Sequence, residues 1–204
     1  MVLDTTYIIL SSLIILSLIP LYIYRKTIFK SIYKKGEIEL FIKDLKLHMK
    51  TNHPKINIDY SIIEKTQGEK DIRIRETLIV EDVINQFFNY EYTKNTQTDI
   101  KRENHWQGYD ENSKSNPKTP IDWPKRKEFA FKRDNCKCNR CGLKMDLKDT
   151  ITVFVKDIND GGGYNFENLI SLCSDCNKIL NSQNPNSTIS NLEVNDKLMF
   201  FVES

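Results

Sequence analysis

The pattern of apolar and polar residues predicts a membrane-spanning start to the chain. Residues 7–24 read YIILSSLIILSLIPLYIY, eighteen residues without a charge, of which eleven are Leu or Ile. As a helix this run would be roughly 27 Å long, close to the roughly 30 Å of hydrocarbon in a bilayer. A buried core helix is a poorer match because the run has no polar face. We therefore predict a transmembrane helix over residues 7–24.

The charges on either side of this run predict its orientation. Asp4 precedes it, whereas the basic residues Arg25, Lys26, Lys30, Lys34 and Lys35 follow it. An excess of positive charge marks the cytoplasmic side of a membrane. A cleaved signal peptide would instead carry basic residues before the apolar run and a small-residue cleavage site after it. Residues 1–35 are thus expected to form a single-pass anchor with a basic juxtamembrane segment, the N-terminus outside and the C-terminal domain cytoplasmic.

Residues 36–92 mix helical and strand patterns. Apolar residues among charges predict a helix over 36–50. Alternation within 55–63 and the isoleucines of 72–74 indicate short strands. Residues 76–92 carry an apolar stripe at three- and four-residue steps, which is typical of an amphipathic helix. We expect a small α+β region here.

Residues 93–118 are polar and are predicted to be a linker. Trp106 and Tyr109 interrupt this composition, so part of the linker is expected to dock on a folded surface. All three histidines of the chain lie at or before residue 105, and none has ligand partners at a metal-binding spacing.

The overall charge does not indicate a function, whereas the positions of the cysteines argue against a secreted, disulfide-bonded protein. Thirty basic and twenty-eight acidic side chains give a net charge of +2, which argues neither for nor against a nucleic-acid partner. All five cysteines lie in the last third of the chain. They therefore do not resemble a disulfide framework spread over a secreted protein.

Four of the cysteines have the spacing of a zinc site. Cys138-x-x-Cys141 and Cys173-x-x-Cys176 each allow one turn to aim two sulfurs at one ion, and four thiolates fill a tetrahedral structural zinc site. Redox-active thiol pairs are the alternative, but two pairs flanking a strand-like segment favour a metal. We interpret Cys136 as a spare thiol.

The stretches around these cysteines agree in order and spacing with one family. They are IDWPKRKEFAFKRDNCKCNRCG, ITVFVKDI, GGG and FENLISLCSDCNK, all between residues 119 and 180. Together they resemble the zinc-braced HNH endonucleases, over well under half of the chain. The resemblance implies a ββα-metal fold, in which a β-hairpin and a helix grip a catalytic metal. We therefore expect an α+β, HNH-like domain over residues 119–204.

The sequence departs from the family at the reactive positions. The family places one or two histidines at the end of the first hairpin strand, an asparagine between the strands, and a histidine directly after the last cysteine. Asn168 occupies the middle position and Asn177 the last. Phe154 occupies the first position or, if the loop is shortened, Asp157 does. The catalytic histidines that the resemblance implies are therefore absent.

One route to catalysis is left open by the carboxylates. Asp157, with Asp160 or Asp175, could bind Mg²⁺ through oxygen. Such a site would lack an obvious general base, which ordinarily contributes about a hundred- to ten-thousand-fold in rate.

The segment before the first cysteine pair is rich in positive charge. From Asp122 to Arg140 there are seven basic and three acidic side chains. Such a patch can hold phosphates, and binding would then weaken steeply with salt. A solvated helix face in a Lys-rich protein is the alternative. The predicted nucleic-acid contacts are Lys125, Arg126, Lys132, Arg133 and Arg140.

The sequence therefore predicts a membrane-anchored, zinc-stabilised, HNH-nuclease-like protein that is catalytically impaired and binds DNA, RNA or another protein. An active, divergent, metal-dependent DNA endonuclease is the first alternative. A purely structural interaction protein with zinc as a staple is the second.

Overall fold

The computed structural model describes residues 5–25, 30–98, 100–114 and 116–203. The chain divides into two compact units, residues 1–44 and 45–204. The first unit contains α1 (Thr5–Ile23) and the start of α3 (Lys30–Asn52). The domain boundaries predicted after residues 35, 92 and 118 stay predictions.

The apolar run at the start of the chain is helical, but it does not meet the requirements of a membrane span. Within the described residues, no helix combines the length and the apolar character needed to cross a bilayer. Helix α1 has 19 residues, which include three serines and Pro20. The predicted transmembrane helix over residues 7–24 is therefore wrong, and the single-pass topology that rested on it has no support. Residues 26–29 of the predicted juxtamembrane segment lie outside the described residues.

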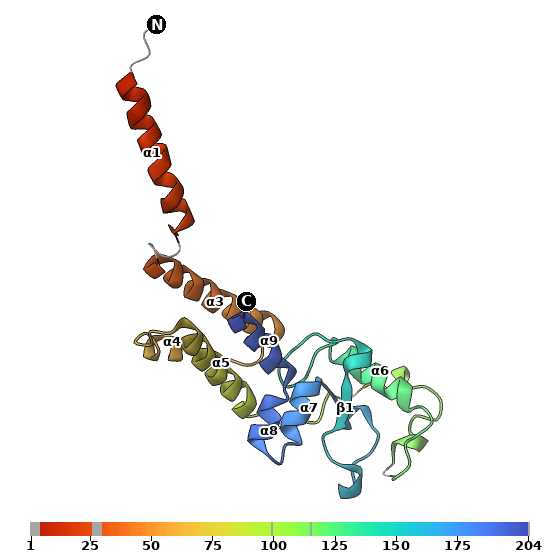
Figure 1. Cartoon of the computed structure of the whole chain (residues 1–204). Coiled ribbons are helices and arrows are strands. Elements are labelled where there is room, and N and C mark those ends of the chain that lie inside the picture. The colour runs from red at the N-terminus through yellow and green to blue at the C-terminus, as the bar shows by residue number, and fades with distance from the viewer. Residues whose placement is uncertain (1–4, 26–29, 99, 115, 204) are drawn as a thin grey trace. The chain divides into compact units, whose positions relative to one another are not determined.

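The second unit is mainly helical, with one small sheet (Figure 1). After the end of α3 its elements are α4 (Ile62–Lys65), α5 (Ile72–Asn89), α6 (Trp123–Arg133), β1 (Ile151–Phe154), β2 (Leu169–Leu172), α7 (Ser174–Leu180), α8 (Pro185–Ser190) and α9 (Glu193–Glu203). Short 3-10 turns lie at 102–104, 111–113, 147–149, 158–160 and 166–168.

The region between residues 36 and 92 is helical rather than α+β. Asp71 caps α5 by accepting hydrogen bonds from the backbone N–H groups of Arg73 and Ile74, so the residues predicted as a second strand form the first turn of a helix. Residues 55–60 form no strand either, because their backbone groups bond elsewhere. The N–H of Lys55 donates to the carbonyl of Cys141, and that of Asp59 donates to a side chain on α5.

Helix α5 supplies much of the core of this unit. Its apolar stripe, predicted from the sequence, is almost fully buried at Ile79, Val80, Val83, Ile84 and Phe87. Helix α9 packs against α5. The C-terminal segment is thus a helix that returns to the core.

A two-stranded antiparallel sheet leads directly into α7. Strands β1 and β2 pair with Ile151 opposite Leu172 and Phe154 opposite Leu169, and all residues of β2 are buried. Helix α6 packs against both strands, and α7 contacts α8 and α9 (Figure 1). The order β1, β2, α7 is the ββα arrangement predicted from the sequence.

The predicted linker is anchored to this sheet. Tyr109 is buried and stacks on Phe166, with ring centroids 4.5 Å apart, and its hydroxyl accepts a hydrogen bond from the Phe166 N–H. The indole N–H of Trp106 donates to Asp122 at 2.7 Å. The docking predicted for these two aromatic residues is confirmed.

Candidate metal centre

The first cysteine pair lies in a tight turn that aims both sulfurs inward. The N–H of Gly142 donates to the carbonyl of Cys138 at 2.9 Å, and the N–H of Cys138 donates to the carbonyl of Leu143 at 2.8 Å. Gly142 has φ of +82°, and a Cβ at this position would lie 3.0 Å from Pro54. Glycine is therefore required here both by the left-handed backbone and by the close approach of the neighbouring chain.

The second pair marks the junction of β2 and α7. Cys173 is the residue that caps α7, and its sulfur accepts a hydrogen bond from the N–H of Cys176 at 3.4 Å. A helix start separates the two thiols by one turn, so both sulfurs point to the same side. The close spacing of these cysteines is thus explained by the strand-to-helix junction.

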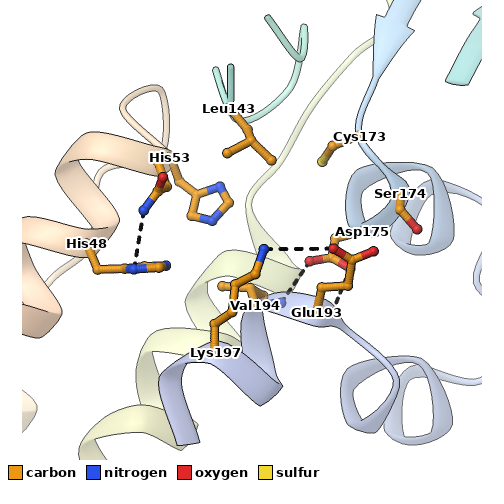
Figure 2. A pocket seen from close by; sticks show the side chains of 10 residues that line it. His48, His53, Leu143, Cys173, Ser174, Asp175, Glu193, Val194 and Lys197 are labelled. Atoms are coloured by element: carbon orange, nitrogen blue, oxygen red, sulfur yellow. Dashed lines mark hydrogen bonds and ion pairs between the residues drawn. The ribbon is translucent and has the colours of Figure 1, made fainter. Parts of the chain in front are cut away.

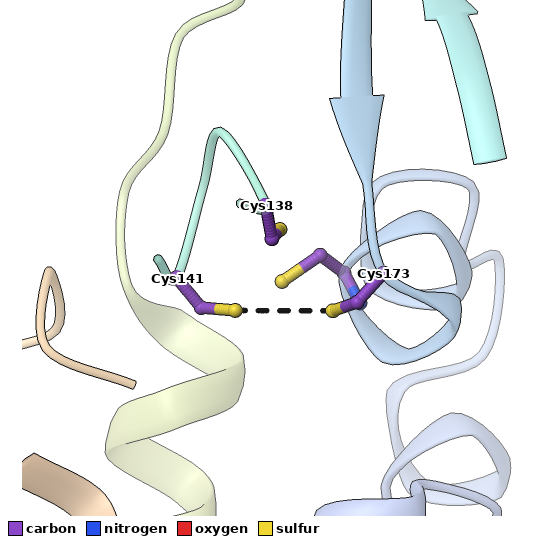
Figure 3. Close-up of side chains that lie close together, drawn as sticks. Cys138, Cys141 and Cys173 are labelled. Atoms are coloured by element: carbon purple, nitrogen blue, oxygen red, sulfur yellow. Dashed lines mark hydrogen bonds between the residues drawn. The ribbon is translucent and has the colours of Figure 1, made fainter. Parts of the chain in front are cut away.

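The four sulfurs converge on one point (Figure 3). They come from Cys138, Cys141, Cys173 and Cys176, lie within 4.8 Å of one another, and belong to buried residues. The sulfurs of Cys141 and Cys173 are 3.8 Å apart. A tetrahedral zinc ion with Zn–S distances of about 2.3 Å requires sulfurs about 3.8 Å apart. The cluster therefore fits a structural zinc ion and offers it four protein ligands.

Hydrogen bonding within the cluster separates the acidities of the thiols. Hydrogen bonds with Cys141, Cys173 and Cys176 lower the pKa of Cys138. Hydrogen bonding with Cys138 raises the pKa of both Cys141 and Cys176. Metal binding requires the thiolate form of each sulfur. Cys136, predicted to be a spare thiol, is a free cysteine outside the cluster.

Asn168 holds the loop between the two strands. Its side-chain oxygen accepts from the N–H of Lys156 at 2.8 Å, while its amide donates to the carbonyls of Lys156 and Gly163 at 2.9 and 2.7 Å. The loop is tight, since a Cβ on Gly162 would lie 2.0 Å from the Lys156 carbonyl oxygen. Asn168 therefore fixes the hairpin connection through three hydrogen bonds.

Phe154 is part of an aromatic cluster. Its ring stacks on Trp123 at 5.7 Å between centroids and meets Tyr164 edge-on at 5.6 Å. Phe154, one of the two residues predicted for the first family position, is therefore a packing residue that joins β1 to α6.

The polar residues near the other reactive positions do not form a second metal site. Asp175 accepts hydrogen bonds from the N–H groups of Glu193 and Val194 at 2.8 and 2.9 Å and thereby holds the start of α9. Asn177 bonds to Asn181 on its own helix. Asp157 is exposed at the loop. Among the described residues, only the four cysteines form a group of three or more metal-ligating side chains.

Three of the predicted nucleic-acid contacts are structural arginines. Arg126 is fully buried, pairs with Asp122 at 2.9 Å, and donates to the carbonyls of Tyr109 and Tyr164. Arg133 donates to the carbonyls of Phe166 and Leu169.

Arg140 is 1% exposed and donates to Cys176 and to backbone carbonyls. Arg126 and Arg140 are buried and Arg133 is half-buried, whereas Lys125 and Lys132 are exposed.

Two histidines from outside the cysteine-containing segment line a cavity next to the metal centre (Figure 2). The cavity measures about 180 Å³ and is bordered by His48, His53, Cys173, Asp175 and Lys197 among others. This proximity is not predictable from the sequence, because the histidines are more than 100 residues from Cys173.

Comparison with known proteins agrees with this geometry. Residues 138–183 match a family model described as HNH endonuclease. Searches of curated proteins and of solved structures gave no match. The matched segment includes both cysteine pairs, the β1–β2 hairpin and α7. Residues 138–183 are therefore similar to HNH endonucleases, and the four clustered cysteines fit the zinc-braced type of that family.

Proposed function

We propose that this HNH domain is catalytically impaired and acts as a zinc-stabilised module that binds nucleic acid. The observation that carries the impairment is the position of Phe154. Its ring packs against Trp123 and Tyr164 at the end of β1. A phenyl ring there can neither accept a proton from water nor bind a metal.

Neighbouring polar groups do not compensate. A general base contributes about a hundred- to ten-thousand-fold in rate, and a metal stabilises the charge that develops on the phosphate oxygens. Asp175 is engaged in holding α9, and Asn177 is a neutral amide bonded to Asn181. Both contributions are therefore expected to be missing.

Exposed lysines on the metal-centre turn support binding. Lys137 and Lys144 face each other across an antiparallel bridge, and both are exposed. Among the described residues, neither forms an ion pair with a carboxylate. Like charges directly opposite each other repel, and a phosphate between them would relieve that repulsion. Together with Lys125 and Lys132 they form the candidate phosphate-binding surface.

A plasmid-nicking assay tests the impairment. The full chain, loaded with zinc, is incubated with supercoiled plasmid and Mg²⁺, Mn²⁺ or Ni²⁺. We expect no nicking above the protein-free control. Nicking that Asp157→Ala abolishes would overturn the proposal and establish a divergent, carboxylate-dependent nuclease.

A salt titration tests the proposed binding of nucleic acid. We expect the chain to bind duplex DNA or RNA with an affinity that falls steeply with salt. The double variant Lys137→Ala/Lys144→Ala should reduce the slope of log affinity against log salt by about 2. The matched control is Lys65→Ala/Lys70→Ala, which removes two exposed lysines elsewhere. No binding at low salt would contradict the proposal and leave a protein partner as the alternative.

A further inference from the structure

Arg140 is a buried cation that joins the cysteine cluster to α5. One guanidinium nitrogen, Nη1, lies 3.6 Å from the sulfur of Cys176. The other, Nη2, donates to the carbonyls of Phe87, Phe88 and Tyr90 at 2.7, 3.1 and 3.0 Å. These carbonyls belong to the end of α5, where helices leave their acceptors unsatisfied. One side chain thus contacts a metal-ligating sulfur and closes a helix.

The positive charge of Arg140 requires a negatively charged partner, and the thiolates of the cysteine cluster can supply a full negative charge. The residue is 1% exposed, and an arginine cannot lose its proton inside a protein. A buried charge is costly unless it is paired. Among the described residues, Arg140 forms no ion pair with a carboxylate. The carbonyls of α5 and the face of the Phe87 ring, 5.4 Å away, offer partial negative charge.

The metal centre carries an excess of negative charge that a buried cation can balance. Four thiolates around a divalent ion carry a net charge of −2, and the four cysteines are buried. A guanidinium at hydrogen-bond distance from one sulfur lowers that charge to −1. Groups that hydrogen-bond to metal ligands fix their orientation and tune their basicity.

We propose that Arg140 is the counter-ion of the metal–thiolate centre and a positioning residue for Cys176, and that it couples metal retention to the end of α5. Loss of the metal removes the anion that pairs with Arg140, and the last turn of α5 then loosens. Loss of Arg140 leaves the centre with its full negative charge, and the metal is then released faster.

Metal release from full-chain variants tests this coupling. The unmodified chain, Arg140→Met and Arg140→Lys are loaded with zinc and transferred to an excess of chelator. We expect Arg140→Met to weaken metal binding by about 10- to 100-fold. Arg140→Lys keeps the positive charge but loses the two-pronged guanidinium, so its metal affinity should lie between those of the unmodified chain and Arg140→Met. The control is Arg126→Met, since Arg126 is equally buried but pairs with Asp122 and touches no cysteine.

A spectroscopic readout separates a positioning role from general destabilisation. With Co²⁺ in place of zinc, loss of the hydrogen bond to Cys176 should move the sulfur-to-metal charge-transfer band to longer wavelength in Arg140→Met but not in Arg126→Met. Equal release rates and equal spectra in the two variants would overturn the proposal.

Hydrogen exchange on the unmodified chain covers the case in which Arg140→Met does not fold. Removing the metal should raise the exchange rate of the last-turn amides of α5 more than that of the amides in α6. Equal changes in the two helices would also refute the coupling.

Discussion

The four cysteines differ from the HNH-equivalent positions, which are Phe154 or Asp157, Asn168 and Asn177, in how their side chains are used. The cysteines come from two segments and converge within 4.8 Å in the interior. Phe154 packs in an aromatic cluster, Asp157 is exposed, and Asn168 and Asn177 form hydrogen bonds through their side chains. The four cysteines thus share one site, whereas the side chains at the HNH-equivalent positions make separate contacts.

This difference teaches that the cysteine cluster and the HNH-equivalent positions stabilise the fold independently. Asn168 ties the hairpin loop through three hydrogen bonds that involve none of the four cysteines. The variants below probe each side of the comparison.

The largest effect on stability is expected from removing one of the four clustered cysteines. Cys173→Ser removes one of the four sulfurs but leaves a hydroxyl that can still cap α7. Structural zinc contributes about 10–16 kcal/mol of apparent folding free energy, comparable with the whole stability of a typical domain, about 5–15 kcal/mol. We expect the domain to unfold and the bound metal to be lost, as measured by circular dichroism and metal analysis.

Cys136→Ser is the control for that experiment. Cys136 lies two residues from Cys138 but outside the cluster. Its substitution should change the free energy of unfolding by no more than about 0.5 kcal/mol. Equal damage from both substitutions would mean that the cysteines stabilise the domain without a metal.

The next effect comes from the hairpin loop. Asn168→Ala removes three hydrogen bonds, each contributing about 1 kcal/mol, so the free energy of unfolding should fall by about 2–3 kcal/mol. Asn177→Ala is the matched control and should cost less than about 1 kcal/mol, since Asn177 bonds only to Asn181 through its side chain. Chemical denaturation of both variants measures the difference, and equal losses would remove the special role of Asn168.

The sequence was sufficient where a short-range pattern carries the structure. The two C-x-x-C pairs predicted the metal cluster, and the spacing from Arg133 to Asn177 predicted the ββα order. Both depend on local turns: a glycine at φ of +82° after the first pair and a helix start at the second.

The sequence failed where long-range packing decides. Arg126, Arg133 and Arg140 look like any basic residues on a helix, yet each has its charge satisfied by backbone carbonyls far along the chain. Ile72 and Ile74 favour a strand by their alternation, but the cap at Asp71 starts a helix there. Apolar content alone also predicts a membrane span at α1, which the structure does not support.

A smaller effect on stability depends on pH and involves His53, which lines the cavity beside the cysteine cluster. Burial, followed by the charge of His48, lowers the pKa of His53 to about 4. Cys138 raises this pKa, while Lys197 and Arg140 lower it further. The folded state therefore binds the proton less tightly than the unfolded state, whose histidine pKa is about 6.5. Stability is full above about pH 6.5 and is lost as the pH falls toward about 4.

A comparison with His53→Phe isolates this contribution. Between about pH 7 and pH 5.5 the unmodified chain should lose about 1 kcal/mol more stability than the variant. Denaturation at several pH values measures both, and the effect of pH on the metal centre cancels in the difference. Parallel pH profiles would show that His53 titrates normally.

The smallest effect on stability is expected at the exposed end of the basic segment. Lys132 and Glu128 form an ion pair at 2.5 Å, with side chains 68% and 48% exposed, and such pairs contribute about 0.2–1 kcal/mol. Lys132→Ala should therefore leave the free energy of unfolding nearly unchanged but reduce the salt dependence of nucleic-acid binding by about one counterion. Arg133→Ala should show the reverse, because its guanidinium already donates to Leu169 and pairs with Asp134. The prediction would be wrong if Lys132→Ala lowered the free energy of unfolding or left the salt dependence of nucleic-acid binding unchanged.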